Sequence, residues 1–425
     1  MGPLTISPDK THLLRDGTPF FWLADTCWSA FTNISMEEWE AYLDLRQKQG
    51  FNVLQINTLP QWDRCGSKQS CFPFPTKDGA RFDFHTLLPD YFQNARHMCQ
   101  KAIEKGFSLM LVVMWCNYVP GTWAANICSD NIIPEECVDP IIRTICEAFN
   151  EFHPIYAVSG DTGFDEEETV DRYRLVADCV DSYAPGALKA WHIKGRYDGL
   201  PQEFAERTDL YLYQSGHNQT AQHMSRKLAE TFAARTPKHP VINSEPCYEQ
   251  MGYSHRQYGR FYRKDIRYAL WNSLLSGACA GITYGAHGVW NWQKPGMPLN
   301  PIGGEGFLQA MPVCQALRFP GALDFAFAKC FFEQHGITHL HPCQEIVVDH
   351  PEEIRAARSE REILLYLPVN APFSLKGSFA DYRVCALDLS TGEEIPFTLD
   401  CADHTAFASI HCGYEDVLLI LEKNR

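Results

Sequence analysis

Eight short apolar runs recur between residues 20 and 318, and each is followed by a polar loop and a segment of helical length. The runs are continuously apolar and do not alternate with polar residues, which is typical of parallel strands covered on both faces. This rhythm constrains the fold more than any other feature of the chain. We expect strands at 20–25, 51–57, 108–115, 155–161, 188–194, 210–216, 240–246 and 281–285.

Helical segments fill the gaps between these runs. Ser35 and Glu38 form a capping-box pair before the first helix, and Gly50 fits the position just after its end. The fifth connection, at 201–207, is short. Further helices are expected at about 88–105, 134–150, 166–183, 219–235, 258–277 and 304–317. Eight strand–helix units predict an α/β fold of the (β/α)₈ barrel type. A doubly wound sheet is disfavoured, because no glycine-rich phosphate turn follows the first strand.

The last eighty or so residues have a different character. Short strand-like runs are separated by turn signals such as Ser390–Gly392, and no long amphipathic helix is apparent. This pattern predicts a small antiparallel β-sandwich. We therefore expect a catalytic barrel over residues 1–342 and a β-sandwich domain over 343–425.

Composition limits the partners and the compartment. The chain has 52 acidic and 37 basic residues, a net charge of −15, which disfavours nucleic acid and anionic membranes as partners. The 17 cysteines contain no CxxC pair, and several lie in apolar runs. The start of the chain has no signal-peptide pattern, and the longest apolar run, 107–116, is half a membrane span. These features predict a cytoplasmic protein with a small-molecule substrate and no cofactor.

Two carboxylates lie at the carboxyl ends of apolar strands: Asp161 at the end of the fourth run and Glu245 at the end of the seventh. A charge at that depth costs on the order of several kcal/mol unless it is paired or used in chemistry. Active sites of barrels lie at the carboxyl ends of the strands, so the two acids face the same mouth. Paired carboxylates are what glycoside hydrolysis requires, and their separation distinguishes retaining from inverting enzymes. A structural ion pair is the alternative for each acid.

Aromatic and polar side chains near the same strand ends are suited to binding a sugar. Indole rings pack on the C–H faces of sugars, and amide, carboxylate and imidazole groups bind hydroxyls. The candidate substrate-binding residues are Asp25, Trp28, Asn57, Trp115, Trp123, Gln214, His217, His287 and Trp290.

Two other classes of function stay open. His192, His217, His255 and His287 could gather with Asp161 or Glu245 in a metal-dependent barrel hydrolase, although the first strand has no HxH pair and no HExxH occurs. We therefore assign no metal ligands. The other alternative is a carbohydrate-binding protein without catalysis. Serine chemistry is disfavoured, because the GxSxG elbow is absent.

An ordered series of motifs resembles one family. LADTCWSAF, followed by EEWEAYLDLRQKQGFNVLQINTL, is similar to the amino-terminal signature of the apiosidase-like glycoside hydrolases, family 140 and its relatives. Later motifs of the same family are matched by the segments YAVSGD, YQSGH, NSEPCYE and YGAHGVWNW. The similarity extends over about residues 5–335, and the terminal β-domain looks like the collagen-binding-like domain that often follows this barrel.

The resemblance implies a barrel glycosidase that releases a terminal furanose-type sugar with retention. By position, Asp161 would be the acid/base and Glu245 the nucleophile. The chain departs from the family in having LADTCW where GDTAW is commoner, and SGD where GGD is commoner. Both carboxylates are kept, while the sugar subsite is expected to differ.

Overall fold

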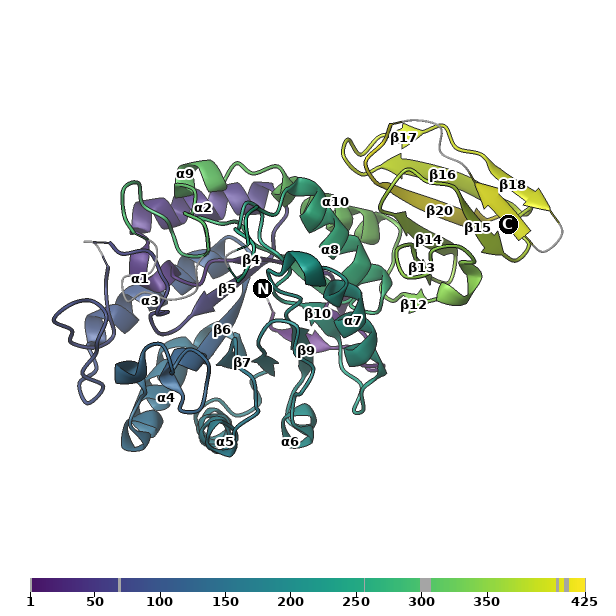
Figure 1. Ribbon diagram of the computed structural model, residues 1–425. Helices are drawn as coiled ribbons and strands as arrows, with labels where there is room; N and C mark the ends of the chain where they lie inside the picture. Colours follow the sequence, from purple (N-terminus) through teal and green to yellow (C-terminus); the bar gives the residue numbers. More distant parts are fainter. Residues whose placement is uncertain are drawn as a thin grey trace.

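The computed structural model describes residues 2–67, 70–255, 257–298, 307–402, 405–408 and 413–424 (Figure 1). Within these residues, eight parallel strands close into a barrel, and the first strand, β4, pairs with the last, β11. This confirms the predicted (β/α)₈ barrel. The strands are β4 (Trp22–Thr26), β5 (Val53–Asn57), β6 (Ser108–Trp115), β7 (Ile155–Gly160), β8 (Lys189–His192), β9 (Leu210–Tyr213), β10 (Val241–Asn243) and β11 (Gly281–Tyr284).

Helices surround the barrel, as expected from the gaps between the strands (Figure 1). Ser35 caps the first long helix, and its capping box with Glu38 is formed in both directions. Gly50 follows that helix with a left-handed φ of 86°, as predicted. The helices are α1 (Ala30–Asn33), α2 (Met36–Lys48), α3 (Pro89–Glu104), α4 (Glu135–Phe149), α5 (Glu167–Tyr183), α6 (Gln202–Glu206), α7 (Met224–Ala234), α8 (Arg263–Leu275), α9 (Val313–Ala316) and α10 (Gly321–Gln334).

The expected helix at 304–317 is the clearest departure. Residues 304–306 lie outside the described residues, and residues 307–312 form a loop. Pro312 starts the single turn of α9, and the long helix of this region, α10, begins after Pro320. A proline lacks the N–H that a helix interior needs, so these two prolines mark helix starts. The expected helix at 258–277 is also shorter, because α8 starts only at Arg263.

A small antiparallel sheet precedes the barrel and packs at its amino-terminal end. It comprises β1 (Leu4–Ile6), β2 (Leu13–Arg15) and β3 (Thr18–Phe20). The guanidinium of Arg15 donates to the carbonyl of Gly106 and to the hydroxyl of Ser108 at the start of β6. Leu13 and Phe20 join the barrel core. This sheet covers the end of the barrel opposite the carboxyl ends of its strands.

The carboxyl-terminal residues form two antiparallel sheets around a second apolar core, which confirms the predicted sandwich (Figure 1). One sheet has the order β12 (His341–Pro342), β13 (Arg355–Arg358), β14 (Glu362–Leu367), β20 (Val417–Lys423), β16 (Tyr382–Asp388) and β17 (Glu394–Ile395). The other has the order β15 (Phe373–Lys376), β19 (Thr405–Ala408) and β18 (Leu399–Ala402). Arg267 of α8 connects this unit to the barrel, because it donates to Asp416 over 2.7 Å and both side chains are buried.

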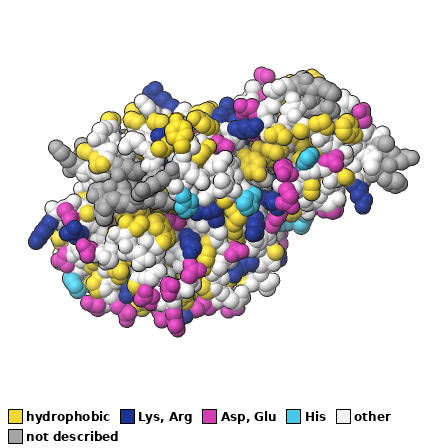
Figure 2. Space-filling view, in the orientation of Figure 1, with side chains coloured by type: hydrophobic (Ala, Val, Ile, Leu, Met, Phe, Trp, Pro, Cys, Tyr) yellow, Lys and Arg dark blue, Asp and Glu magenta, His cyan; other side chains and the backbone are white. Residues whose placement is uncertain are grey.

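Acidic side chains are abundant on the molecular surface. Figure 2 shows Asp and Glu gathered on the surface over α4, α5 and α6. In these helices Glu135, Glu136, Glu167 and Asp178 are exposed. Within the described residues, no helix is both long and apolar enough to cross a bilayer.

A buried ion pair attaches the first barrel strand to its helix. Asp25 of β4 and Arg46 of α2 are both fully buried, with 2.6 Å between Arg46 Nε and Asp25 Oδ2. The Tyr42 hydroxyl donates to the same oxygen over 2.7 Å. A buried charge that loses its partner is far more costly than a surface one, so this pair fixes α2 against the barrel.

We predict that Arg46→Met lowers the free energy of unfolding by about 3–5 kcal/mol, because Asp25 is left buried without its counter-charge. Urea denaturation followed by circular dichroism measures the change. Tyr42→Phe is the matched control: it removes one hydrogen bond to the same carboxylate and is expected to cost about 1.5–3 kcal/mol. A loss below about 1 kcal/mol for Arg46→Met, the size typical of a surface pair, would contradict this assignment.

Candidate active site

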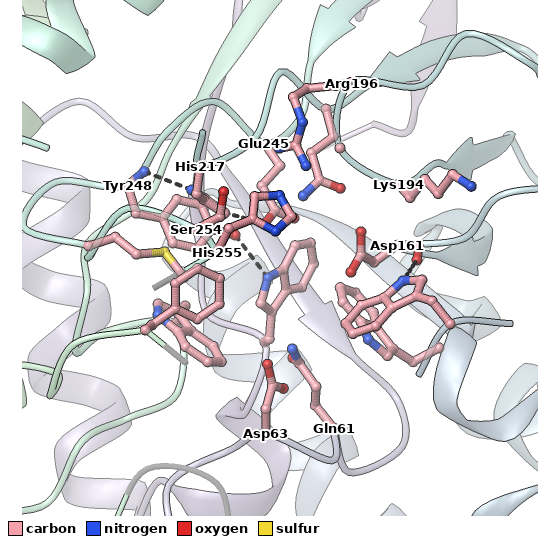
Figure 3. A pocket seen from close by; sticks show the side chains of 18 of the residues that line it. Gln61, Asp63, Asp161, Lys194, Arg196, His217, Glu245, Tyr248, Ser254 and His255 are labelled. Atoms are coloured by element: carbon pink, nitrogen blue, oxygen red, sulfur yellow. Dashed lines mark hydrogen bonds and ion pairs between the residues drawn. The ribbon is translucent and has the colours of Figure 1, made fainter. Parts of the chain in front are cut away.

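A cavity of about 750 Å³ opens at the carboxyl ends of the barrel strands (Figure 3). Each of the eight strands contributes side chains to it, either directly or through the loop that follows. The lining residues are Trp28, Gln61, Asp63, Trp115, Trp123, Ile127, Asp161, Lys194, Gly195, Arg196, Gln214, His217, Glu245, Tyr248, Met251, Ser254, His255, Trp290 and Phe307. This is the end of a barrel at which catalytic groups gather.

The structure brings both candidate catalytic carboxylates, Asp161 and Glu245, to this cavity, and Figure 3 shows them pointing into it from different strands. Most of the candidate binding residues line it too. They are Trp28, Trp115, Trp123, Gln214, His217 and Trp290. Three others, Asp25, Asn57 and His287, do not line the cavity.

Each of these three has a different environment. Asp25 is used in the buried pair with Arg46. Asn57 donates over 2.9 Å to the side-chain oxygen of Gln61, which does line the cavity. His287 Nδ1 accepts from the indole N–H of Trp290 over 3.1 Å, and its Nε2 donates to the carbonyl of Leu308 over 2.7 Å. Burial lowers the pKa of His287 to about 3, which agrees with a neutral ring.

Glu245 is held by two imidazoles. His217 Nε2 lies 2.9 Å from its Oε1, and His192 Nε2 lies 3.2 Å from its Oε2. All three side chains are buried. Burial by itself raises the pKa of Glu245, yet the two imidazoles outweigh it and lower the pKa to about 2. The carboxylate is therefore ionised at neutral pH without much access to water.

Tyr248 completes the surroundings of Glu245. Its backbone N–H donates to His217 Nδ1 over 3.4 Å, which leaves the imidazole proton on Nε2, facing the carboxylate. The Tyr248 hydroxyl accepts from the indole N–H of Trp28 over 3.0 Å. Burial and the nearby Glu245 carboxylate raise the pKa of Tyr248, so its hydroxyl stays protonated. Gly285 allows this packing, because a Cβ there would lie 2.0 Å from the Tyr248 ring.

Asp161 follows β7 in a tight turn. Its φ of 48° is in the left-handed region, which is uncommon for residues other than glycine. The preceding Gly160 packs on the indole of Trp115, where a Cβ would come within 2.2 Å of a ring carbon. The indole N–H of Trp123 donates to the backbone carbonyl of Asp161 over 2.9 Å. The turn therefore lies between two aromatic side chains of the cavity wall.

Aromatic residues form two packed pairs at the wall of the cavity. The Trp28 and Trp115 rings lie 5.3 Å apart, and Trp62 packs edge-on against Trp123 at 5.8 Å. Such tilted and edge-on pairs are the favoured arrangements of aromatic rings. The wall offers flat apolar surfaces beside the two carboxylates, which is what the C–H faces of a sugar ring need.

Several lining residues were missed by sequence reasoning. Lys194 and Arg196 follow β8, Gln61 and Asp63 follow β5, and the loop after β10 adds Tyr248 and Ser254. His255, which the sequence suggested only as a possible metal ligand, also lines the cavity. The only sequence signal for these residues is their position after a strand. That signal is not specific, because such loops also carry polar residues with no role in the site. The sequence suggested His192 only as a possible metal ligand, and His192 is not among the predicted substrate-binding residues. Its contact with Glu245 depends on the closed barrel, which places β8 two strands away from β10.

A metal centre has no support in the arrangement of these groups. Within the part of the chain that the structure describes, no group of three or more His, Cys, Asp or Glu side chains could hold a metal ion. The Nε2 atoms of His192 and His217 face the oxygens of Glu245. Both imidazoles are therefore directed at the Glu245 carboxylate.

Glu249 is a second carboxyl group with a strongly shifted pKa. Burial raises its pKa to about 7, a value suited to proton transfer. However, it accepts from the Tyr284 hydroxyl over 2.7 Å and from the backbone N–H of Gly321 over 3.0 Å, and it does not line the cavity. Its position therefore argues for a structural role.

The family model of the apiosidase-like catalytic domain matches residues 7–339. No curated protein matches the chain in sequence. Among solved structures, a glycoside hydrolase is 20% identical with a TM-score of 0.81, covering 99% of this chain and 97% of its own. A family 5 glycoside hydrolase from Bacteroides vulgatus ATCC 8482 has the same identity and TM-score, with 99% and 93% covered.

A putative glycoside hydrolase from the same organism is 17% identical with a TM-score of 0.68, covering 99% of this chain and 82% of its own. These structures share the fold, and the family model covers more than three quarters of the chain. The chain therefore belongs to the apiosidase-like family of glycoside hydrolases.

Proposed function

We propose that this glycoside hydrolase releases a terminal, furanose-type sugar from a small glycoside or oligosaccharide with retention of anomeric configuration. The observation that carries the proposal is the ionised Glu245 carboxylate, which is held by two imidazoles in the cavity that also contains Asp161. The furanose preference is supported by the family resemblance alone.

The reaction would proceed in two displacements. In the first, the Asp161 carboxyl donates its proton to the glycosidic oxygen while Glu245 attacks the anomeric carbon. The bond to the leaving alcohol breaks, and a glycosyl ester forms on Glu245. In the second, the Asp161 carboxylate takes a proton from water, whose oxygen attacks the same carbon and releases Glu245. A nucleophile must be ionised before it attacks, and the low pKa of Glu245 supports this assignment.

Exo-action is supported by the shape of the barrel. The cavity of about 750 Å³ is within the range of about 300–1,000 Å³ found for single small-molecule sites. The sheet of β1, β2 and β3 covers the opposite end of the barrel. A cavity of this size is suited to the end of a glycoside, and the release of a terminal sugar is otherwise supported by the family resemblance.

We also propose that the enzyme works in a reducing compartment such as the cytoplasm. The cysteines of the described chain are free thiols, and most of them are buried. Burial raises the pKa of thiols such as Cys99, and a protonated thiol is oxidised less readily than a thiolate. Free buried thiols are typical of proteins that work under reducing conditions.

A panel of aryl furanosides and pyranosides tests the activity, and Glu245→Gln tests the nucleophile. This substitution removes the charge while keeping the shape, so we expect kcat/KM to fall by at least about 10³-fold. Glu249→Gln is the matched control in the same loop, outside the cavity, and should keep activity near the wild-type level. Comparable turnover by Glu245→Gln and the wild type would contradict the assignment. Sugar binding without turnover across the panel would favour a non-catalytic binding protein.

Asp161→Asn tests the acid/base. We expect cleavage of glycosides with poor leaving groups to fall by about 10²–10⁴-fold, because no proton is available for the departing oxygen. Glycosides with activated leaving groups should still form the glycosyl ester. Added azide should then restore turnover and give a glycosyl azide, which can be identified by mass spectrometry. An equal loss for both types of leaving group, without rescue by azide, would argue against this role.

Retention is tested by methanolysis. A glycosyl ester on Glu245 would transfer the sugar to methanol on the face from which the aglycone left. We expect the methyl glycoside formed in dilute methanol to have the anomeric configuration of the substrate, as determined by proton NMR. A methyl glycoside is chosen because free furanoses lose their anomeric identity in water. A product of opposite configuration would show inversion.

A further inference from the structure

His192 contacts both candidate catalytic residues. It ends β8, its side chain is fully buried, and its ring packs at 5.4 Å from Trp28 and 5.7 Å from Trp115. Its Nδ1 accepts the backbone N–H of Asp161 over 3.0 Å, and its Nε2 lies 3.2 Å from Glu245 Oε2. One imidazole therefore connects the turn after β7 to the loop after β10.

The hydrogen bond to Asp161 acts on a strained turn. A left-handed conformation costs about 1–2 kcal/mol for a residue with a side chain, and Asp161 adopts it with a φ of 48°. The backbone N–H of such a residue needs an acceptor when it is buried. His192 Nδ1 provides that acceptor, and the turn directs the Asp161 carboxylate into the cavity (Figure 3).

The same hydrogen bond determines where the imidazole proton lies. A nitrogen that accepts a hydrogen bond must keep its lone pair, so the proton of neutral His192 is on Nε2. That nitrogen lies within ion-pair distance of Glu245 Oε2, and both atoms are buried with no other hydrogen-bond partner among the described residues. The other polar groups that face this carboxylate are His217, from the loop after β9, and Tyr248, from the loop of Glu245 itself.

We propose that His192 is a positioning residue of the hydrolase: its Nδ1 supports the backbone turn that aims Asp161, while its Nε2–H holds the carboxylate of Glu245. The proposal rests on the function proposed above. In this arrangement the acid/base and the nucleophile share one rigid support, which is locked between two indoles and does not itself touch the substrate cavity.

Two substitutions separate the two contacts. The side-chain oxygen of His192→Asn would stand close to the position of Nδ1 and could still accept from Asp161, but its amide would not reach Glu245. The amide nitrogen of His192→Gln would stand close to the position of Nε2 and could donate to Glu245, but no acceptor would remain for Asp161. Near-ultraviolet circular dichroism checks that each variant keeps its folded aromatic core.

The first readout is the pKa of Glu245, which is measured by a pH titration monitored by carbon-13 NMR of glutamate-labelled protein. The signal is assigned by its absence in Glu245→Gln. Loss of a polar contact to a buried charged group corresponds to a shift of about one to two pH units, so we expect the pKa of Glu245 to rise by that amount in His192→Asn and to stay near the wild-type value in His192→Gln. His287→Asn is the control, because that buried histidine contacts Trp290 and Leu308 but not Glu245.

The second readout is the dependence of the rate on the leaving group. In His192→Gln we expect kcat/KM to fall by about 10–100-fold for poor leaving groups and by less than about threefold for activated ones, because only the former need Asp161 to be aimed. In His192→Asn this dependence should resemble the wild type. If His192→Asn does not fold, the leaving-group dependence of His192→Gln decides the question.

An unchanged pKa of Glu245 in His192→Asn, or an equal fall for all leaving groups in His192→Gln, would overturn the proposal and leave His192 as a core residue. Failure of the proposed function gives a different result: the wild type would turn over none of the glycosides. In that case the NMR titration still decides whether His192 holds the Glu245 carboxylate.

Discussion

A carboxylate that has lost its water stays ionised only when other donors replace that water, and the structure around the cavity meets this need at Glu245. The imidazoles come from His192, which ends β8, and from His217, which follows β9, while Glu245 follows β10. Closure of the barrel is what brings these residues together. Two histidines near the strand ends meet this one electrostatic demand, and they lower the pKa of the carboxylate.

Aromatic packing supplies the rigidity on which this arrangement depends. The Trp28 indole contacts the ring of Trp115 and the hydroxyl of Tyr248, and both indoles pack against His192. Because a well-packed interior resists small displacements, each polar group is held at its hydrogen-bonding distance. Small residues are needed where rings approach the backbone closely, as Gly160 and Gly285 do. The cavity wall thus holds the candidate catalytic groups in place.

The strands and the two carboxylates could be predicted because they depend on local patterns. Continuous apolar runs specify buried parallel strands, and Ser35 with Glu38 specifies a helix start within four residues. Asp25 shows the limit of this reasoning. Like Asp161 it lies at the end of a strand, so the sequence alone could not distinguish a buried ion pair from a cavity residue. Its partner Arg46 is brought close only by the packing of α2. The contact of His192 with Glu245, between residues 53 positions apart, likewise depends on barrel closure. Helix α10 was missed because its apolar sequence lacks the polar face of a surface helix.

The buried Glu249 makes the stability of the loop after β10 depend on pH. Its ordinary pKa of 4.5 in the unfolded chain becomes about 7 in the folded protein because of burial, so the folded state binds more protons between these two values. Stability contributed by this group is therefore fully present below pH 4.5 and is lost as the pH rises through 7, a change on the order of 3 kcal/mol. Glu249 is hydrogen-bonded to Tyr284 of β11 and to the start of α10. The segment that carries Glu245 is thus anchored more strongly in mildly acidic than in alkaline surroundings.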